Sequence, residues 1–175
     1  MSDLASWLAD RLHADQDLSR EQLDALAVEI GRAEELWRPF VSHDLETRFY
    51  QQLYRDPNVD VWLICWVGGQ NTGYHDHDRS SGAVYVCEGQ LCEDYFQRAD
   101  DGWIREQTNI HSSGGHFHFD AADIHGVRHP GGQDISTSVH VYSPALWRMG
   151  HYEPDERGML RRIAVTYADE LLGAA

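Results

Sequence analysis

The residues with the clearest capacity for chemistry are two histidines that stand two positions apart, His75 and His77. On extended backbone, residues i and i+2 point to the same face, so both imidazoles can reach one metal ion. Imidazole suits iron, zinc, copper and nickel alike, so the ligand type does not choose the metal. A second pair, His116 and His118, has the same spacing, and ordinary surface or core histidines explain either pair equally well.

A second candidate group alternates along the segment STSVHVYSP, residues 136–144. Ser138, His140 and Tyr142 should project from one face of a strand, because side chains repeat with a period of two. A hydroxyl, an imidazole and a phenol can form a relay in which Ser138 fixes the ring of His140 and His140 orients the Tyr142 hydroxyl. An ordinary polar strand face would look the same, and alternation alone does not decide between them.

The first third of the chain, which precedes these residues, shows helical periodicity. Leu4, Trp7, Leu8 and Leu12 have the three-and-four spacing of one helix face. Ser19 and Gln22 have the spacing of a capping box, which predicts a second helix that runs to Gly31. We expect short helical pieces over residues 37–40 and 45–53.

From residue 59 the pattern changes to strands. VDVWLICWV is an unbroken β-branched and aromatic run between Pro57 and Gly68-Gly69, which suits a strand buried on both faces. Short strands separated by turn residues should follow, over 83–87, 90–97, 103–107, 115–119, 124–128 and 136–142. The tail, 159–172, reads as one more strand and a helical turn. Many short strands predict a mainly β sandwich or barrel rather than βαβ units.

Composition limits the class of protein. The 175 residues suit one compact domain, and 29 acidic residues against 14 Lys and Arg give a net charge of −15. This charge argues against nucleic acid and anionic membranes as partners, and we see no obligate protein partner. No apolar run could cross a membrane, and the first residues carry acids where a secretory signal carries basic residues. Three cysteines without CxxC spacing predict no disulfide framework, so we expect a cytoplasmic protein.

The context of the histidines resembles the cupin motifs. Every spacing of the first cupin motif is matched, at Gly69, His75, His77, Gly82 and Gly89. Gly82 stands where that motif usually has a metal-binding Glu. Gly114 and His125 fall at the glycine and histidine of the second motif, in which Asp120, Ala122 and His129 replace the usual residues.

This resemblance implies a cupin-type small β-barrel, or jelly-roll, preceded by an N-terminal helical segment. We expect residues 1–56 to form that segment, packed on a barrel of residues 57–175. The barrel would bring His125 beside His75 and His77, and would leave His116 and His118 as non-ligands. Three neutral imidazoles leave a divalent ion its full double charge, which favours an anionic, chelating substrate.

Four segments together resemble the thiol dioxygenases of the cysteine dioxygenase family. They are Cys65-Trp66, His75-Asp76-His77, Ile124-His125-Gly126-Val127 and the Ser138–Pro144 string. The resemblance implies a non-haem Fe(II) held by His75, His77 and His125, with the relay of Ser138, His140 and Tyr142 outside the metal ligands. Such enzymes insert both atoms of dioxygen into a small thiol and form a sulfinic acid.

Two departures from the family pattern bear on the substrate. Gly82 replaces the cysteine that animal members crosslink to the tyrosine matching Tyr142, whereas bacterial members commonly carry glycine there. Gln52, two residues after Tyr50, replaces the arginine that holds the carboxylate in cysteine-specific members. Members with this glutamine resemble those that act on 3-mercaptopropionate, so the resemblance implies that acid or cysteine as the expected substrate. Arg55 and Arg148 are the candidate arginines for its carboxylate.

Two other functions stay open at this stage. One is a metal-dependent cupin of different chemistry, such as a dioxygenase that cleaves a carbon bond or an isomerase. The other is a cupin that binds a small acidic ligand without catalysis. The sequence shows no helix-turn-helix with a basic face, which disfavours a DNA-binding sensor.

Overall fold

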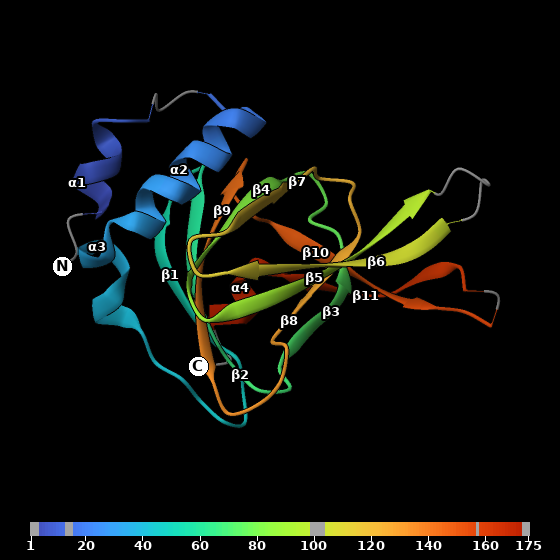
Figure 1. The fold of residues 1–175 in the computed structure, drawn as a ribbon. Coiled ribbons are helices and arrows are strands. Elements are labelled where there is room, and N and C mark those ends of the chain that lie inside the picture. Colours follow the sequence, from blue (N-terminus) through green and yellow to red (C-terminus); the bar gives the residue numbers. More distant parts are fainter. Residues whose placement is uncertain (1–3, 13–15, 99–103, 157, 173–175) are drawn as a thin grey trace.

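The computed structural model describes residues 4–12, 16–98, 104–156 and 158–172. It contains two antiparallel sheets that face each other, with helices on the outer side of one of them (Figure 1). The five-stranded sheet has the order β1-β2-β9-β4-β7, and the six-stranded sheet has the order β11-β10-β3-β8-β5-β6. The helical elements are α1 Leu4–Ala9, α2 Arg20–Arg32, α3 Glu34–Trp37, the 3₁₀ turn Arg38–Phe40 and α4 Ala168–Leu172.

From β2 onward the chain crosses repeatedly between the two sheets, and the hairpins β5–β6 and β10–β11 each keep two successive strands in the six-stranded sheet. Their bounds are β1 Phe49–Arg55, β2 Asp60–Val67, β3 Asn71–His75, β4 Ser81–Glu88, β5 Gln90–Arg98, β6 Ile104–Ser112, β7 His116–Phe119, β8 His125–Arg128, β9 Ile135–Ser143, β10 Arg148–Pro154 and β11 Leu160–Tyr167. The paired strands β5–β6 and β10–β11 extend away from the helices in Figure 1. The structure confirms the prediction of a mainly β fold with helices at its amino-terminal end.

The five-stranded sheet separates two cores, because it is apolar on both faces. All eight residues of β2 are buried. On the outer face of β2, Leu63 packs in a hydrophobic cluster with residues of the helices. On its inner face, Trp62 and Trp66 pack in a second cluster between the two sheets. The predicted doubly buried strand is therefore present, and its second face lines the interior where the candidate site lies.

Helix α2 covers the outer face of this sheet. Ser19 accepts a hydrogen bond from the backbone of Gln22, and the Gln22 side chain accepts one from the backbone of Ser19, which completes the predicted capping box. The helical stripe then buries Leu23, Ala27 and Ile30 against the sheet. Helices α1 to α3 thus stabilise the scaffold from outside, whereas Ala168 of α4 packs in the core between the sheets.

Three parts of the secondary structure differ from the sequence prediction. Residues 45–53 were expected to be helical, but Phe49–Arg55 is strand β1, which pairs antiparallel with β2. Strands β3 and β10 were not predicted. Both contain Gly and polar residues, and only their pairing with neighbours distant in sequence makes them strands. Of the strand predicted over 103–107, Trp103 lies outside the described residues, and the rest belongs to the longer β6.

The boundary predicted at residue 56 stays a prediction. Strand β1 lies before that boundary and pairs with β2 after it.

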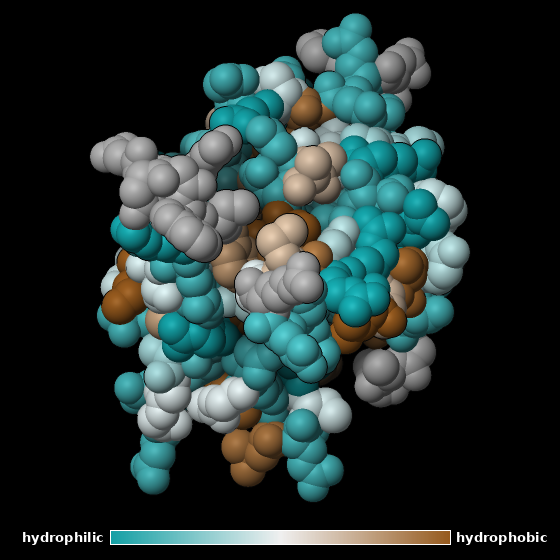
Figure 2. Space-filling view, turned by 90° about the vertical axis from the view of Figure 1, so that its right-hand side faces the viewer, coloured by the Kyte–Doolittle hydropathy of each residue, from teal (hydrophilic) through white to brown (hydrophobic). Residues whose placement is uncertain are grey.

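Figure 2 shows the side of the molecule opposite the helices, where hydrophobic residues near the centre are bordered by hydrophilic ones. Cys65, Cys87 and Cys92 are free thiols. In the described part of the chain, no helix is both long and apolar enough to cross a bilayer.

Candidate metal centre and its cavity

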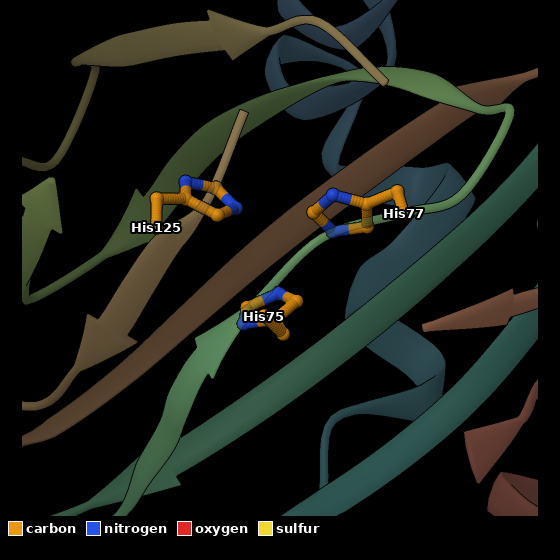
Figure 3. A group of neighbouring side chains, drawn as sticks. All are labelled: His75, His77 and His125. Atoms are coloured by element: carbon orange, nitrogen blue, oxygen red, sulfur yellow. The ribbon is translucent and has the colours of Figure 1, made fainter. Parts of the chain in front are cut away.

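Three histidines converge between the sheets (Figure 3). His75 is the last residue of β3, His77 lies in the loop that follows, and His125 is the first residue of β8. Strands β3 and β8 pair so that His75 lies opposite His125, although the two residues are fifty positions apart in the sequence. One nitrogen from each ring lies within 4.8 Å of the other two. All three side chains are buried. The structure therefore brings together the three histidines that the sequence analysis predicted as metal ligands.

The free nitrogens of this group suit a metal ion. His75 Nδ1 lies 3.1 Å from the Gly73 carbonyl oxygen, and His125 Nδ1 lies 3.1 Å from a Glu93 carboxylate oxygen. Both contacts require the Nδ1 proton and leave Nε2 as the nitrogen with a lone pair. His125 Nε2 and His77 Nδ1 are buried and have no hydrogen-bond partner among the described residues. Unpartnered buried imidazole nitrogens beside one another are what a metal ion would satisfy.

Electrostatics also favour the form of histidine that binds metals. Burial, reinforced by the neighbouring imidazoles, lowers the pKa of His75 and that of His77 well below the ordinary histidine value. Neutral imidazole is the ligating form, so these side chains need not lose a proton to bind a cation. Their role as metal ligands stays a prediction.

The second histidine pair lies elsewhere. His116 and His118, on β7, are exposed and face helix α2, where His116 Nδ1 lies 2.7 Å from Asp24. They belong to no group of three potential metal ligands among the described residues. The placement fits the expectation that they are not ligands.

The predicted relay lies on β9, beside the histidine group. Ser138 Oγ lies 2.9 Å from His140 Nε2, and the Tyr142 hydroxyl lies 3.4 Å from His140 Nδ1. Trp66 Nε1 donates to Ser138 Oγ at 2.9 Å, a contact that the sequence did not reveal. The Tyr142 ring centroid is 5.4 Å from that of His77.

Burial keeps the relay uncharged. Burial, together with the nearby His125 and Arg48, lowers the pKa of His140 to about 3. Burial raises the pKa of the Tyr142 phenol above its usual value. At neutral pH His140 is therefore a neutral imidazole and Tyr142 a protonated phenol.

A cavity of about 130 Å³ connects the histidine group and the relay. Its walls are mostly apolar or aromatic, and no carboxylate is present among its described lining residues. Polar side chains of this lining include Arg48, Tyr50, His151 and Thr166.

The structure separates the four predicted substrate-binding residues. Tyr50 lines the cavity. Gln52 and Arg55 instead contact the buried carboxylate of Asp60, at 2.9 and 3.0 Å, and Arg148 pairs with Asp78 at 2.9 Å. None of these three is among the lining residues, and the roles assigned to all four stay predictions.

Arg48 is a cavity residue that the sequence reading missed. It donates to the Tyr50 hydroxyl and to the Asn71 carbonyl, and its guanidinium carbon lies 4.9 Å from the centroids of the Tyr50 and Trp66 rings. Its Nε is buried and has no hydrogen-bond partner in the described part of the chain. Arg48 and Tyr50 are two positions apart, so a strand reading of this segment would have placed them on one face.

Comparison with solved structures supports the fold. Recombinant oxalate oxidase in complex with glycolate is 13% identical, with a TM-score of 0.51 over 63% of this chain and 59% of that chain. Oxalate oxidase in complex with the substrate analogue glycolate, in a second structure, is 12% identical, with a TM-score of 0.50 over 73% of this chain and 60% of that chain. At such identities these likenesses concern the fold alone. The chain thus has a two-sheet β fold of the kind seen in these structures, and a buried three-histidine group between its sheets is a candidate metal centre.

Sequence comparison identifies the family. Residues 5–155 match the model of the family described as cysteine dioxygenase type I, so the chain belongs to this family. Cysteine dioxygenase type 1 of Danio rerio is 26% identical over 115 residues, which are 62% of this chain. The chain spans 57% of the length of that relative.

The position of Gly82 gives a testable constraint on the site. A Cβ atom there would lie 2.4 Å from Phe119 Cζ and 3.1 Å from Tyr142 Cδ1, and the Phe119 ring stacks on His77 with centroids 4.2 Å apart. Gly82→Ala should therefore push Phe119 toward the histidine group and lower the free energy of unfolding by about 1–3 kcal/mol. Urea denaturation of the metal-free protein measures this change.

The matched control for Gly82→Ala is the double variant with Phe119→Leu. The smaller side chain makes room for the new methyl group, so the double variant should be more stable than the sum of the two single changes predicts. A Gly82→Ala protein that unfolds at the wild-type urea concentration would contradict the packing argument.

Proposed function

We propose that this protein is a thiol dioxygenase that uses non-haem Fe(II) and dioxygen to oxidise a small mercapto acid to its sulfinic acid. The observation that carries the proposal is the convergence of the three buried histidines with His140 and Tyr142 on one cavity, where Ser138 contacts His140 from behind. Membership of the cysteine dioxygenase family supports the same chemistry.

His75, His77 and His125 would hold the iron through their free ring nitrogens. Ferrous iron supplies a Lewis acid that lowers the pKa of a thiol and a redox centre that reacts with dioxygen. In the net reaction, a thiolate gains both oxygen atoms and becomes a sulfinate. The mostly apolar cavity wall would hold the reactants together and exclude bulk water.

The relay would direct one proton toward the reactants. Ser138 accepts from Trp66, so its own hydroxyl proton is available for His140 Nε2. The neutral ring then carries its proton on Nδ1, which faces the Tyr142 oxygen. Because that oxygen accepts from His140, the phenol proton of Tyr142 is free to donate a hydrogen bond into the cavity.

Arg48 is the residue that we assign to the substrate carboxylate. It is the guanidinium among the described lining residues, and its unpartnered Nε gives it spare capacity to donate. Guanidinium binds a carboxylate through two parallel hydrogen bonds. The described lining has no acidic side chain to pair with an ammonium group, so 3-mercaptopropionate fits the cavity better than cysteine. A reducing cytoplasm suits both the free thiols and such a substrate.

The direct test is turnover of purified, iron-loaded protein with candidate thiols. We expect oxygen uptake matched one to one by sulfinate, with higher kcat/KM for 3-mercaptopropionate than for cysteine. An oxygen electrode and mass spectrometry of the product measure the two quantities. Uptake without a sulfur product would favour a cupin of other chemistry. Ligand binding without uptake, unaffected by His75→Ala, would favour a non-catalytic binding protein.

Arg48→Gln tests the carboxylate site. Loss of a hydrogen bond to a charged group costs about 1.5–3 kcal/mol, so KM for 3-mercaptopropionate should rise about ten- to hundredfold. Ethanethiol, which lacks the carboxylate, should show no such change. Arg148→Gln, which removes a guanidinium outside the cavity, is the matched control. The assignment fails when both variants raise KM equally.

Tyr142→Phe tests the proton that the relay directs. The change should lower kcat by about ten- to hundredfold, the effect of one lost hydrogen bond to a charged partner, and leave the iron content at the wild-type value. Steady-state kinetics and metal analysis measure the two effects. Tyr54→Phe, which removes a phenol that donates to Asp56 instead, should leave both unchanged. Loss of iron from Tyr142→Phe would show that the phenol has a different role.

A further inference from the structure

A carboxylate lies beside the histidine group without belonging to it. Glu93 is on β5, two residues after the fully buried Leu91 and on the same face, and only 8% of its surface is exposed. A charged group on the core-facing side of a strand is costly unless it is paired and hydrogen-bonded. Its partners therefore indicate why the chain keeps an acid here.

Both partners of Glu93 are histidines, one for each carboxylate oxygen. Oε1 lies 3.1 Å from Nδ1 of His125, and Oε2 lies 3.2 Å from Nε2 of His111. His111 is itself fixed, because its ring stacks on Phe117 with centroids 4.4 Å apart. Each carboxylate oxygen therefore contacts one imidazole nitrogen, and Glu93 is held between His111 and His125.

We propose that Glu93, anchored by His111, is the positioning residue that fixes the tautomer of His125 and aims its Nε2 at the metal. The inference rests on the metal centre of the proposed function, but not on the identity of the thiol. If Glu93 served only to pair with His111, its other carboxylate oxygen would not need to contact His125. The oxygen does bind there, and the opposite nitrogen of the same ring is buried without a partner.

The position of the charge matters as much as the orientation. The three candidate ligands are all histidines, and Gly82 offers no carboxylate beside them. A divalent ion bound there would therefore keep its full double charge, because none of the atoms that touch it would be negatively charged. Glu93 places one negative charge just beyond a ligand ring, where it makes His125 a stronger donor without occupying a coordination position. The site thereby gains metal affinity and still leaves positions open for substrate.

Glu93→Gln is the test, with metal affinity rather than activity as the readout. Cobalt(II) and zinc(II) dissociation constants are measured on metal-free protein by competition with a chelator, and the visible spectrum of the cobalt form reports the ligand field. Outer partners of ligating histidines are worth about ten- to hundredfold in metal affinity, so we expect a loss in that range and a shifted cobalt spectrum. Asp94→Asn is the matched control.

Asp94 stands next to Glu93 on the same strand and loses the same charge, but it pairs with Arg128 instead. Asp94→Asn should keep the wild-type affinity and spectrum. Equal affinities and spectra in the wild type and Glu93→Gln would overturn the proposal, as would equal losses in Glu93→Gln and Asp94→Asn.

His111→Gln keeps the acid and all three candidate ligands but removes the anchor of Glu93. It should weaken cobalt binding in the same direction by a smaller factor, and it decides the question where Glu93→Gln does not fold. Wild-type affinity in His111→Gln would then overturn the proposal. Metal binding by the wild type without thiol turnover would count against the proposed function alone, whereas the absence of metal binding would overturn both.

Discussion

The register between β3 and β8 is the constraint on which the site depends. It sets His75 directly opposite His125, and the loop that leaves β3 returns His77 to the same point. A shift of one residue would turn one imidazole to the other face of the sheet, because side chains alternate. Two buried ring nitrogens, His77 Nδ1 and His125 Nε2, have no hydrogen-bond partner among the described residues and are costly without a ligand, so the sheet holds an arrangement whose gain comes from binding.

The same alternation separates stability from chemistry within the other sheet. Val139 and Val141 of β9 pack toward the helices, whereas Ser138, His140 and Tyr142 face the interior. Strand β2 alternates in the same way, and its Trp66 both fills the inner core and donates to Ser138. The helices therefore stabilise one face of a sheet whose other face carries the relay.

Local patterns in the sequence revealed most of the site, but not the parts that depend on distant pairing. The HxH pair and the alternating segment around His140 are local, and the motif spacings extended the group to His125. Residues 45–53 were misread because their apolar spacing also fits a helix, while the strand depends on pairing with β2. That error hid Arg48, whose position beside Tyr50 makes sense only on extended backbone. Glu93 was missed because a single acid in a strand carries no signal until its neighbours are known.

The distribution of charge around the cavity connects these observations. The carboxylate of Glu93 lies behind His125, and the guanidinium of Arg48 lies at the cavity wall. Negative charge therefore lies outside the cavity, and positive charge borders it. An anionic mercapto acid would meet the metal and Arg48 without facing a carboxylate, whereas a substrate that carries an ammonium group would find no counter-charge among the described lining residues. In the proposed function, a glycine at position 82 and the placement of Glu93 behind His125 would together favour anion binding at both ends of a short substrate.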